Sequence, residues 1–382
     1  MKITIVLGAF FPVPPLMGGA VEKVWFALGQ EFARRGHEVV QISRRHPQLP
    51  RTETIEGVRH IRVSGSAQPR SILWLKWLDL MYSIRARLVL PHADILVTNT
   101  FWLPMLVRTR RPGLLYIHVQ RGPKGQMRWY AHAARLLAVS RAIADAIMAE
   151  APELADKVRV IPNALPVQIA NGDDAPRERT VLFVGRIHPE KGLELLLRAW
   201  RRLPQELLSR WRLKLVGPSE VHLGGGGEKF LAQLQTITAQ TSANVEWAGA
   251  VFREGDLTAD YRGARLFIYP SLAESGEALP VAPLEAMAHG CGPVVSDLSC
   301  FRDYIEDGVT GFVFDHHGSD PEQSLASRLT EVLKMSDQEL TRIGAAAREK
   351  AKHFSLEIVA QQYVADFESL LGASRENRRE YA

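Results

Sequence analysis

Short apolar runs alternate with amphipathic stretches along the first 170 residues of the chain. In Val21–Arg34 the apolar residues recur every three or four positions, which predicts a helix, and Gly36 is placed to end it. Short continuous apolar runs are typical of parallel strands buried on both faces. Such runs predict strands at Ile3–Leu7, Glu38–Ile42, Asp94–Val97, Leu114–Ile117, Leu136–Val139 and Val158–Ile161.

A polar segment, Val167–Arg179 (VQIANGDDAPRER), interrupts this alternation and indicates a linker. The alternation then restarts, and helical pattern fills Pro321–Leu371 before a charged tail that we expect to be frayed and flexible, residues 373–382. The sequence therefore predicts an α/β protein with two doubly wound parallel-sheet domains, residues 1–170 and 171–354. The second domain has predicted strands at Val181–Val184, Leu213–Val216, Val245–Trp247, Leu266–Tyr269, Pro293–Val295 and Gly311–Phe314, and predicted helices at Gly192–Trp200, Phe230–Thr241 and Ala282–His289.

Composition and charge narrow the class of protein. The 382 residues are 46% hydrophobic and 23% charged, which is typical of a globular protein and excludes a disordered, collagen-like or coiled-coil chain. The opening MKITIVLGAFFPVPP could imitate a signal peptide, but its β-branched residues favour a first strand. Two cysteines, Cys291 and Cys300, are too few for a disulfide framework or a zinc site, so we expect a cytoplasmic protein in which both are small buried residues.

The charge is divided unevenly between the two halves. Residues 1–170 hold 23 Lys and Arg against 11 Asp and Glu, which gives a net charge of +12. Residues 171–382 hold the remaining 24 Lys and Arg and 31 Asp and Glu, which gives a net charge of −7. Within the basic half, Arg70–Arg87 (RSILWLKWLDLMYSIRAR) is apolar around most of a helix. It is either a core or interdomain-cleft helix, or an interfacial anchor whose Trp residues and cations meet an anionic lipid surface.

Two motifs follow predicted strands: one contains a pair of glycines, and the other contains two cations. Gly18 and Gly19 precede the first helix, where paired glycines allow a backbone to approach a phosphate, although a plain tight turn would look the same. In VGRIHPEKG, residues 184–192, Arg186 and Lys191 come after the first strand of the second domain. Two cations there suit a diphosphate, and a solvated rim is the alternative.

Three carboxylates lie in residues 271–295, SLAESGEALPVAPLEAMAHGCGPVV. Glu277 would lie on the loop before the predicted helix and Glu285 in its first turn, so the two could approach one ligand from different sides. Glu274 is a spare acid that could replace Glu277 if the loop had another register. An ordinary first-turn acid remains the alternative for Glu285.

Together, MGGAVE, GRIHPEKG and the Glu-x7-Glu segment running into LEAMAHGCGPVVSD resemble glycosyltransferase family 4, the group 1 glycosyl transferases. The fragments LAVSRAIADAI, VRVIPNALP and YIEDGVTGFVFD support the resemblance, which covers Ile3 to about Phe367. It implies a GT-B fold of two Rossmann-like domains, the first for the acceptor and the second for a nucleoside-diphosphate sugar. It also implies that a last helix, about 355–372, packs back on the first domain.

The resemblance assigns roles to individual residues. Arg186 and Lys191 would clamp the diphosphate, Glu285 would accept hydrogen bonds from the ribose hydroxyls, and Glu277 would hold hydroxyls of the transferred sugar. Gly18 and Gly19 would bring backbone amides to the distal phosphate. His118, in YIHVQ, would lie close to the sugar, or else it is a packed histidine at a strand end. Leu279 would belong to the donor-binding loop.

The implied reaction is sugar transfer with retention of configuration and without a metal or other cofactor. No Asp-x-Asp segment suggests a metal site. Retention requires a covalent Glu277 intermediate or a same-face substitution, and the resemblance favours the second. The chain departs from the family after the first Glu, where x-Phe-Gly is common and this sequence has Ala278-Leu279-Pro280. Proline has no backbone N–H that could contact the sugar nucleotide. This departure bears on the identity of the donor sugar.

The acceptor is indicated only by charge. Arg108–Arg111 (RTRR), Arg121–Arg128 (RGPKGQMR) and the Trp-rich segment suggest a saccharide or lipid-linked acceptor in surface polysaccharide, lipopolysaccharide or glycolipid assembly, with peripheral contact to the inner membrane face. No basic-aromatic motif indicates nucleic acid. The alternatives are a non-catalytic nucleotide-sugar-binding protein and a sugar-nucleotide epimerase. A Rossmann oxidoreductase would need a GxGxxG motif that the first strand lacks.

Overall fold

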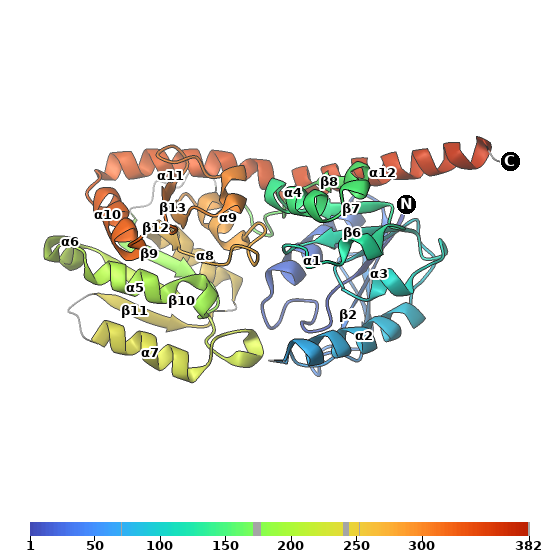
Figure 1. The fold of residues 1–382 in the computed structure, drawn as a ribbon, viewed down its shortest axis with the longest axis horizontal. Coiled ribbons are helices and arrows are strands. Elements are labelled where there is room, and N and C mark those ends of the chain that lie inside the picture. Colours follow the sequence, from blue (N-terminus) through green and yellow to red (C-terminus); the bar gives the residue numbers. More distant parts are fainter. Residues whose placement is uncertain (70, 171–176, 240–243, 252, 381–382) are drawn as a thin grey trace. The chain divides into compact units, whose positions relative to one another are not determined.

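The computed structural model describes residues 1–69, 71–170, 177–239, 244–251 and 253–380, and in this range it leaves out the side chains of 254 and 375–380 (Figure 1). The chain forms two compact units: unit 1 contains Met1–Pro166 and Ser355–Ala382, and unit 2 contains Val167–Phe354. Within the expected linker, residues 171–176 lie outside the described residues, as do Arg70 and Thr241 of two expected helices. Each unit is built around one open sheet.

The described part of unit 1 contains an eight-stranded sheet in the order β3-β4-β2-β1-β5-β6-β7-β8. Apart from the β3–β4 pair, neighbouring strands are parallel. All six strands predicted for this half are present, with ends that agree or differ by at most two residues. The strands are β1 (Lys2–Val6), β2 (Glu38–Arg44), β3 (Thr52–Ile55), β4 (Val58–Val63), β5 (Ile95–Thr98), β6 (Leu114–Val119), β7 (Arg135–Ala138) and β8 (Val158–Val160).

The hairpin of β3 and β4 was not predicted. Its two strands are antiparallel and joined by Glu56 and Gly57, with φ of 48° and 80°. Two successive positive φ angles give the turn that matches the twist of a hairpin. Glu is uncommon at the first of these positions, which explains why the turn carried no signal in the sequence.

The helices of unit 1 include the C-terminal helix. Tyr363 and Phe367 of α12 pack against Trp25 and Phe32 of α1, and Figure 1 shows these two helices on the same unit. Gly36, with φ of 85°, follows α1 as expected. The helices are α1 (Ala20–Arg34), α2 (Ile72–Leu88), α3 (Leu103–Leu106), α4 (Arg141–Glu150) and α12 (Leu356–Glu380), with 3-10 turns η1 (Met127–Tyr130) and η2 (Pro152–Lys157).

The described part of unit 2 contains a six-stranded parallel sheet in the order β11-β10-β9-β12-β13-β14. Its strands are β9 (Glu178–Val184), β10 (Arg212–Val216), β11 (Val245–Gly249), β12 (Ala264–Tyr269), β13 (Gly292–Ser296) and β14 (Phe312–Phe314). Its helices are α5 (Leu193–Arg201), α6 (Gln205–Arg210), α7 (Glu228–Ala239), α8 (Glu254–Gly263), α9 (Val281–Ala288), α10 (Pro321–Leu333) and α11 (Asp337–Ala351). Four 3-10 turns are η3 (Pro189–Lys191), η4 (Val221–Leu223), η5 (Ser299–Asp303) and η6 (Lys352–Phe354).

The C-terminal region differs from its prediction in two ways. The helical pattern of Pro321–Leu371 is divided into α10, α11 and α12, and the capping box of Ser336 and Glu339 starts the second of these. The part of the expected frayed tail up to Glu380 is helical, because α12 continues to that residue. Cys291 and Cys300 are buried free thiols, as predicted. Within the described residues, no helix combines the length and apolarity needed to cross a membrane.

Candidate active site

The predicted cations and the first carboxylate of the Glu-x7-Glu segment follow two neighbouring strands. β9 and β12 are parallel neighbours in the unit 2 sheet, so their carboxyl ends meet at the same edge. Arg186 and Lys191 follow β9, and Glu277 follows β12. Ligands of open α/β sheets bind at this edge.

Lys191 and Glu277 form a nearly buried ion pair. Their side chains are 10% and 7% exposed, and Lys191 Nζ donates to Glu277 Oε1. The same carboxylate oxygen accepts from Tyr269 Oη at 3.1 Å and Ser271 Oγ at 2.8 Å, and Lys191 Nζ also donates to Tyr269 Oη at 2.9 Å. Burial, and then the Glu277 carboxylate, raise the pKa of Tyr269 well above its ordinary value, so its hydroxyl stays protonated. The four side chains form one polar cluster with a cation, an anion and two hydroxyl groups.

A glycine allows the two strand ends to approach so closely. Gly192 follows Lys191 in the left-handed region, with φ of 69°. A Cβ atom there would lie 1.9 Å from the carbonyl oxygen of Pro270, so no other residue fits without displacement. α5 begins at the next residue, Leu193. The amino-terminal end of α5 is thus held against the end of β12.

Arg186 contacts the Gly-rich loop of HLGGGGE, residues 222–228. Its Nη1 donates to the carbonyl oxygen of Gly224 at 2.8 Å, and its Nη2 pairs with Glu190. The side chain is 30% exposed. Arg186 is therefore held in place by two acceptors, and part of its side chain remains accessible.

Glu285 lies in the second turn of α9, not in the first as predicted. The helix begins at Val281 after Pro280, which stands at the N-cap, so Glu285 is its fifth residue. The side chain is buried, and Tyr261 Oη of α8 donates to Glu285 Oε2 at 3.1 Å. Burial first, and then Glu285, raise the pKa of Tyr261 well above its ordinary value. Glu285 is thus fixed by a hydrogen bond to a neighbouring helix.

The departures from the family sequence lie at the start of α9. Leu279 is buried, Pro280 has no N–H, and Pro283 is the third residue of the helix and also lacks one. The first turn of α9 therefore offers fewer free amides than an ordinary helix N-terminus. The alternative register of Glu274 is not adopted: Glu274 pairs with His316, and it is Glu277 that reaches Lys191.

In unit 1, Gly18 and Gly19 lead into α1 with φ of 76° and 97°. Gly19 is the N-cap, and a Cβ atom there would lie 2.3 Å from Glu22 Oε2. Glu22 itself is buried, and burial raises its pKa to about 7. Gly19 is therefore packed against an acid that can be protonated near neutral pH.

His118, on β6, is a packed side chain of unit 1. Its Nδ1 accepts from Trp25 Nε1 at 3.1 Å, and the two rings meet edge to face with centroids 5.0 Å apart. The residue is 3% exposed, and burial lowers its pKa to about 3. The imidazole is therefore neutral, which favours the interpretation of a packed histidine at a strand end.

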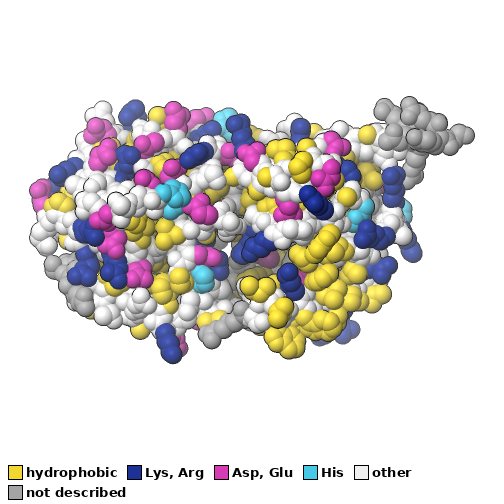
Figure 2. Space-filling model, viewed as in Figure 1, with side chains coloured by type: hydrophobic (Ala, Val, Ile, Leu, Met, Phe, Trp, Pro, Cys, Tyr) yellow, Lys and Arg dark blue, Asp and Glu magenta, His cyan; other side chains and the backbone are white. Residues whose placement is uncertain are grey.

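The segment predicted as a core or interdomain-cleft helix, or as a membrane anchor, is α2, and within unit 1 it is not a core helix. Its buried residues are Asp79, Tyr82, Ser83 and Ala86. Several of its large apolar side chains are more than half exposed, whereas others, among them Leu75 and Leu78, are only partly exposed. Figure 2 shows a continuous hydrophobic area at the position of α2. The most exposed are Ile72, Leu73, Trp74, Trp77 and Leu88.

Sequence reasoning missed five residues of these clusters: Tyr269, Ser271, Glu190, Tyr261 and Glu22. Tyr269 is the last residue of β12 and Ser271 follows it by two positions, so their position at a strand end was a usable signal. Glu190 stands four residues after Arg186, a spacing typical of helical ion pairs. Glu22 is the last residue of the MGGAVE motif, which was a usable signal, whereas Tyr261 carried none.

Comparison with known families identifies the class of protein. Residues 168–350 match the family described as "Glycosyl transferases group 1", and residues 17–168 match "Glycosyltransferase Family 4". The two matches meet at the boundary of the two units and together cover most of the chain. The protein belongs to glycosyltransferase family 4 and is a glycosyltransferase.

Several curated proteins are similar in sequence. Spore coat protein SA of Bacillus subtilis is 23% identical over 96% of this chain and 99% of its own length. A lipopolysaccharide 1,2-N-acetylglucosaminetransferase of Salmonella typhimurium is 24% identical over 95% and 97%. A phosphatidyl-myo-inositol mannosyltransferase of Mycobacterium tuberculosis is 30% identical, but over only 56% of this chain and 54% of that protein.

Solved structures establish the fold. HepE of Anabaena, in complex with UDP and glucose, aligns with a TM-score of 0.71 over 97% of this chain and 100% of its own, at 18% identity. Sucrose-phosphate synthase of Thermosynechococcus elongatus aligns with a TM-score of 0.77 over 98% and 100%, also at 18% identity. The fold is GT-B, with two parallel-sheet domains, as the sequence predicted.

Proposed function

We propose that this glycosyltransferase moves a sugar from a nucleoside-diphosphate sugar to a hydroxyl of a saccharide or lipid-linked acceptor. The acceptor class is a precursor of a surface polysaccharide, lipopolysaccharide or glycolipid. The names of the Salmonella and Mycobacterium relatives support a lipopolysaccharide-type or lipid-linked acceptor. The observation that carries the proposal is the cluster of Lys191, Glu277, Tyr269 and Ser271 beside Arg186, at the carboxyl ends of β9 and β12.

Arg186 and Lys191 are proposed to stabilise the departing diphosphate without a metal ion. Negative charge develops on the phosphate oxygens as the bond to the sugar breaks, and fixed cations there stabilise the transition state. Lys191 is paired with Glu277 in the structure, so the ammonium is already positioned and would turn from the carboxylate to a phosphate oxygen. Loss of one such group typically lowers the rate by about 10²–10³. Gly18 and Gly19 are proposed to add backbone amides to a phosphate.

Glu277 is proposed to bind hydroxyls of the transferred sugar, with retention by same-face substitution. One of its oxygens already accepts from Lys191, Tyr269 and Ser271, and hydrogen bonds of this kind lower the nucleophilicity of a carboxylate. This supports substitution without a covalent intermediate. In that mechanism the leaving phosphate takes the proton of the acceptor hydroxyl. Glu285, positioned by Tyr261, is proposed to accept from the ribose.

A thermal-shift panel tests the donor site. The panel compares the melting temperature with UDP, GDP, ADP, dTDP and CMP, each with and without EDTA. It is run on the wild type, on Glu285→Ala and on the control Arg198→Ala, which alters an exposed ion pair on α5. A ligand at 100 times its dissociation constant stabilises by about 2.7 kcal/mol. For a unit of this size that raises Tm by about 5–10 °C.

The expected result is a shift with one diphosphate that persists in EDTA, is kept in Arg198→Ala and is lost in Glu285→Ala. The matching sugar nucleotide should then release its diphosphate when an acceptor extract is added, and NMR of the product should show the anomeric configuration of the donor. Absence of a shift with every nucleotide would count against the transferase site itself. A shift that disappears in EDTA would contradict metal independence.

The apolar face of α2 is proposed to rest on an anionic membrane surface. Leu73, Trp74 and Trp77 are 81%, 60% and 52% exposed, while the polar Asp79 is buried and accepts from the Trp102 amide at 3.2 Å. Trp side chains suit the headgroup region, and the net charge of +12 in this half of the sequence suits anionic lipid. This placement would bring unit 1 to lipid-linked acceptors.

Liposome flotation tests the membrane proposal. The double variant Trp74→Gln/Trp77→Gln and a triple variant of Arg108, Arg110 and Arg111 to Gln should both lose binding to anionic vesicles. Val309→Gln, at an exposed apolar position of unit 2, serves as the control and should bind as the wild type does. Equal flotation of all variants at low salt, where charge effects are strongest, would refute the proposal.

A further inference from the structure

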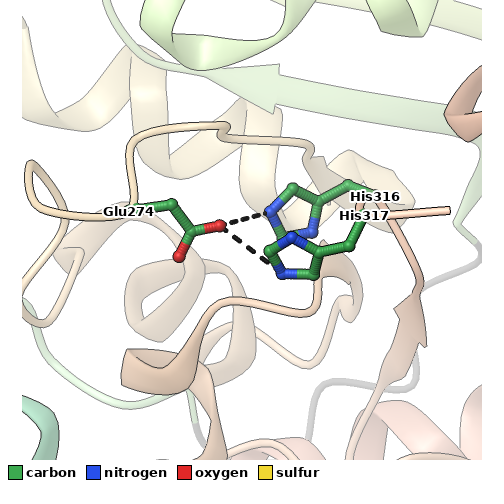
Figure 3. A group of neighbouring side chains, drawn as sticks. All are labelled: Glu274, His316 and His317. Carbon is green, nitrogen blue, oxygen red and sulfur yellow. Dashed lines mark hydrogen bonds and ion pairs between the residues drawn. The ribbon is translucent and has the colours of Figure 1, made fainter.

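Three potential metal ligands of unit 2 lie together outside the cluster of Lys191 and Glu277. Glu274 comes from the loop between β12 and α9, and His316 and His317 follow β14 (Figure 3). His316 Nε2 lies 2.8 Å from Glu274 Oε1, and His317 Nε2 lies 3.5 Å from the same oxygen. The ligand atoms of the three side chains all lie within 4.8 Å of one another.

The two histidines are held in place by their surroundings. The side chain of His316 is 5% exposed, and its ring meets Phe314 edge to face at 6.5 Å. The rings of His316 and His317 have centroids 3.9 Å apart. Asp315 Oδ1 accepts from the His317 amide at 2.8 Å, which fixes the turn that carries both rings. Figure 3 shows both imidazoles directed toward the Glu274 carboxylate.

We propose that Glu274, His316 and His317 bind one divalent transition-metal ion, with Zn²⁺ as the expected metal. Zn²⁺ takes His nitrogen and carboxylate oxygen at about 2.0–2.2 Å, so small movements of two exposed side chains would admit the ion between the three ligand atoms. Two imidazoles with one carboxylate suit Zn²⁺, Ni²⁺ or Cu²⁺, whereas Mg²⁺ and Ca²⁺ prefer oxygen ligands. Three protein ligands leave a coordination position for water.

The ion would connect two segments that are distant in sequence. Glu274 stands three residues before Glu277 on the same loop, and His316 lies 42 residues further along the chain. A metal bond between them would hold the loop that carries Glu277 against the segment after β14. The effect on nucleotide affinity rests on the function proposed above, whereas metal binding itself does not.

Zinc titration of the full chain tests the site. The protein is first treated with a chelator, dialysed into a non-coordinating buffer at pH 7.5, and titrated with ZnCl₂ by calorimetry. His317→Ala and Glu274→Gln are the test variants, because both side chains are more than half exposed and folding should tolerate the changes. His92→Ala, an exposed histidine of unit 1, is the control.

The wild type and His92→Ala should bind one equivalent with the same affinity. Each test variant should weaken binding by at least about 100-fold, since loss of even an outer-shell partner costs about 10–100-fold. Co²⁺ in place of Zn²⁺ should give a visible absorption band in the wild type that His317→Ala removes. No saturable binding, or equal affinity in all four proteins, would overturn the site.

A second titration separates the consequence from the site. The diphosphate that gives a thermal shift is titrated into wild type and His317→Ala, each with Zn²⁺ and with EDTA. Tighter nucleotide binding with Zn²⁺ in the wild type alone supports the proposed constraint on the Glu277 loop. Equal nucleotide affinities would overturn that constraint while the zinc titration still decides the site. Failure of every nucleotide to bind would count against the proposed function and leave the zinc result intact.

Discussion

Removal of Lys191 should destabilise unit 2 even when no ligand is present. The Glu277 side chain is 7% exposed in the structure, and in Lys191→Ala its carboxylate would keep hydrogen bonds from Tyr269 and Ser271 but lose its cation. Breaking a buried ion pair by removing one partner costs about 3–5 kcal/mol, and the two remaining donors place the expected loss near 3 kcal/mol. For a domain of this size that loss lowers Tm by about 6–12 °C.

The double variant Lys191→Met/Glu277→Gln distinguishes a lost ion pair from general damage. Replacing both partners leaves no uncompensated charge, so the double variant should be more stable than the sum of the two single changes predicts. We expect a coupling energy of at least about 1 kcal/mol. Arg198→Ala serves as the control, because its pair with Glu194 on α5 is exposed and such pairs generally contribute about 0–1 kcal/mol.

Differential scanning calorimetry without nucleotide measures these differences on the wild type and five variants. The variants are Lys191→Ala, the single changes Lys191→Met and Glu277→Gln, the double variant and Arg198→Ala. The assay does not depend on the donor or acceptor, so it tests the geometry of the cluster alone. A Tm for Lys191→Ala within 2 °C of wild type, or purely additive effects in the double variant, would refute the reasoning. Either result would mean that water reaches Glu277 and screens its charge.

Three further predictions concern other parts of the fold. Burial raises the pKa of Glu22 from 4.5 to about 7, so between these pH values the folded state holds a proton that the unfolded state releases. The free energy of unfolding should therefore fall by about 3 kcal/mol as pH rises from 4.5 to 7, and it should stay level above pH 7. Chemical unfolding of Glu22→Gln should lack this decline, and an unchanged pH profile would contradict the assignment. His118, whose pKa burial lowers to about 3, should show no imidazole titration between pH 8 and 5 by NMR. Gly192→Ala should lower Tm much more than Gly249→Ala does. Both glycines have φ near 70°, but only at Gly192 would the new Cβ atom meet Pro270. Similar melting temperatures of the two variants would show that the loop yields.

The parallel strands could be predicted because their burial leaves a direct mark in the sequence. β1 and β5 are apolar along nearly their whole length, as strands covered on both faces must be. β3 and β4 have a mixed burial pattern at the sheet edge and carried no such mark. Local pattern therefore missed the hairpin at one edge of the unit 1 sheet, although it identified the other edge strands, β8, β11 and β14.

The candidate site could be predicted only as a set of motifs. The motifs placed Arg186, Lys191 and Glu277 at strand ends, but the pairing of Lys191 with Glu277 joins residues 86 positions apart. That pairing depends on the close approach at Gly192 and on where α9 begins. The start of α9 at Val281, one residue earlier than expected, also places Glu285 in the second turn of the helix instead of the first. Glu274 and His316, 42 positions apart, show the same limit.

The α2 helix shows why hydrophobicity alone could not decide between a core helix and an anchor. Both interpretations require the same apolar residues, and only the side that packs on the unit distinguishes them. Unit 1 buries the narrow side formed by Asp79, Tyr82, Ser83 and Ala86, and burial raises the pKa of Asp79 to about 6. Sequence rules assign Asp and Ser to solvent, so they predict the opposite orientation. An exposed apolar face of this extent is uncommon on a monomer and marks a contact surface, which the vesicle experiment with Trp74 and Trp77 addresses directly.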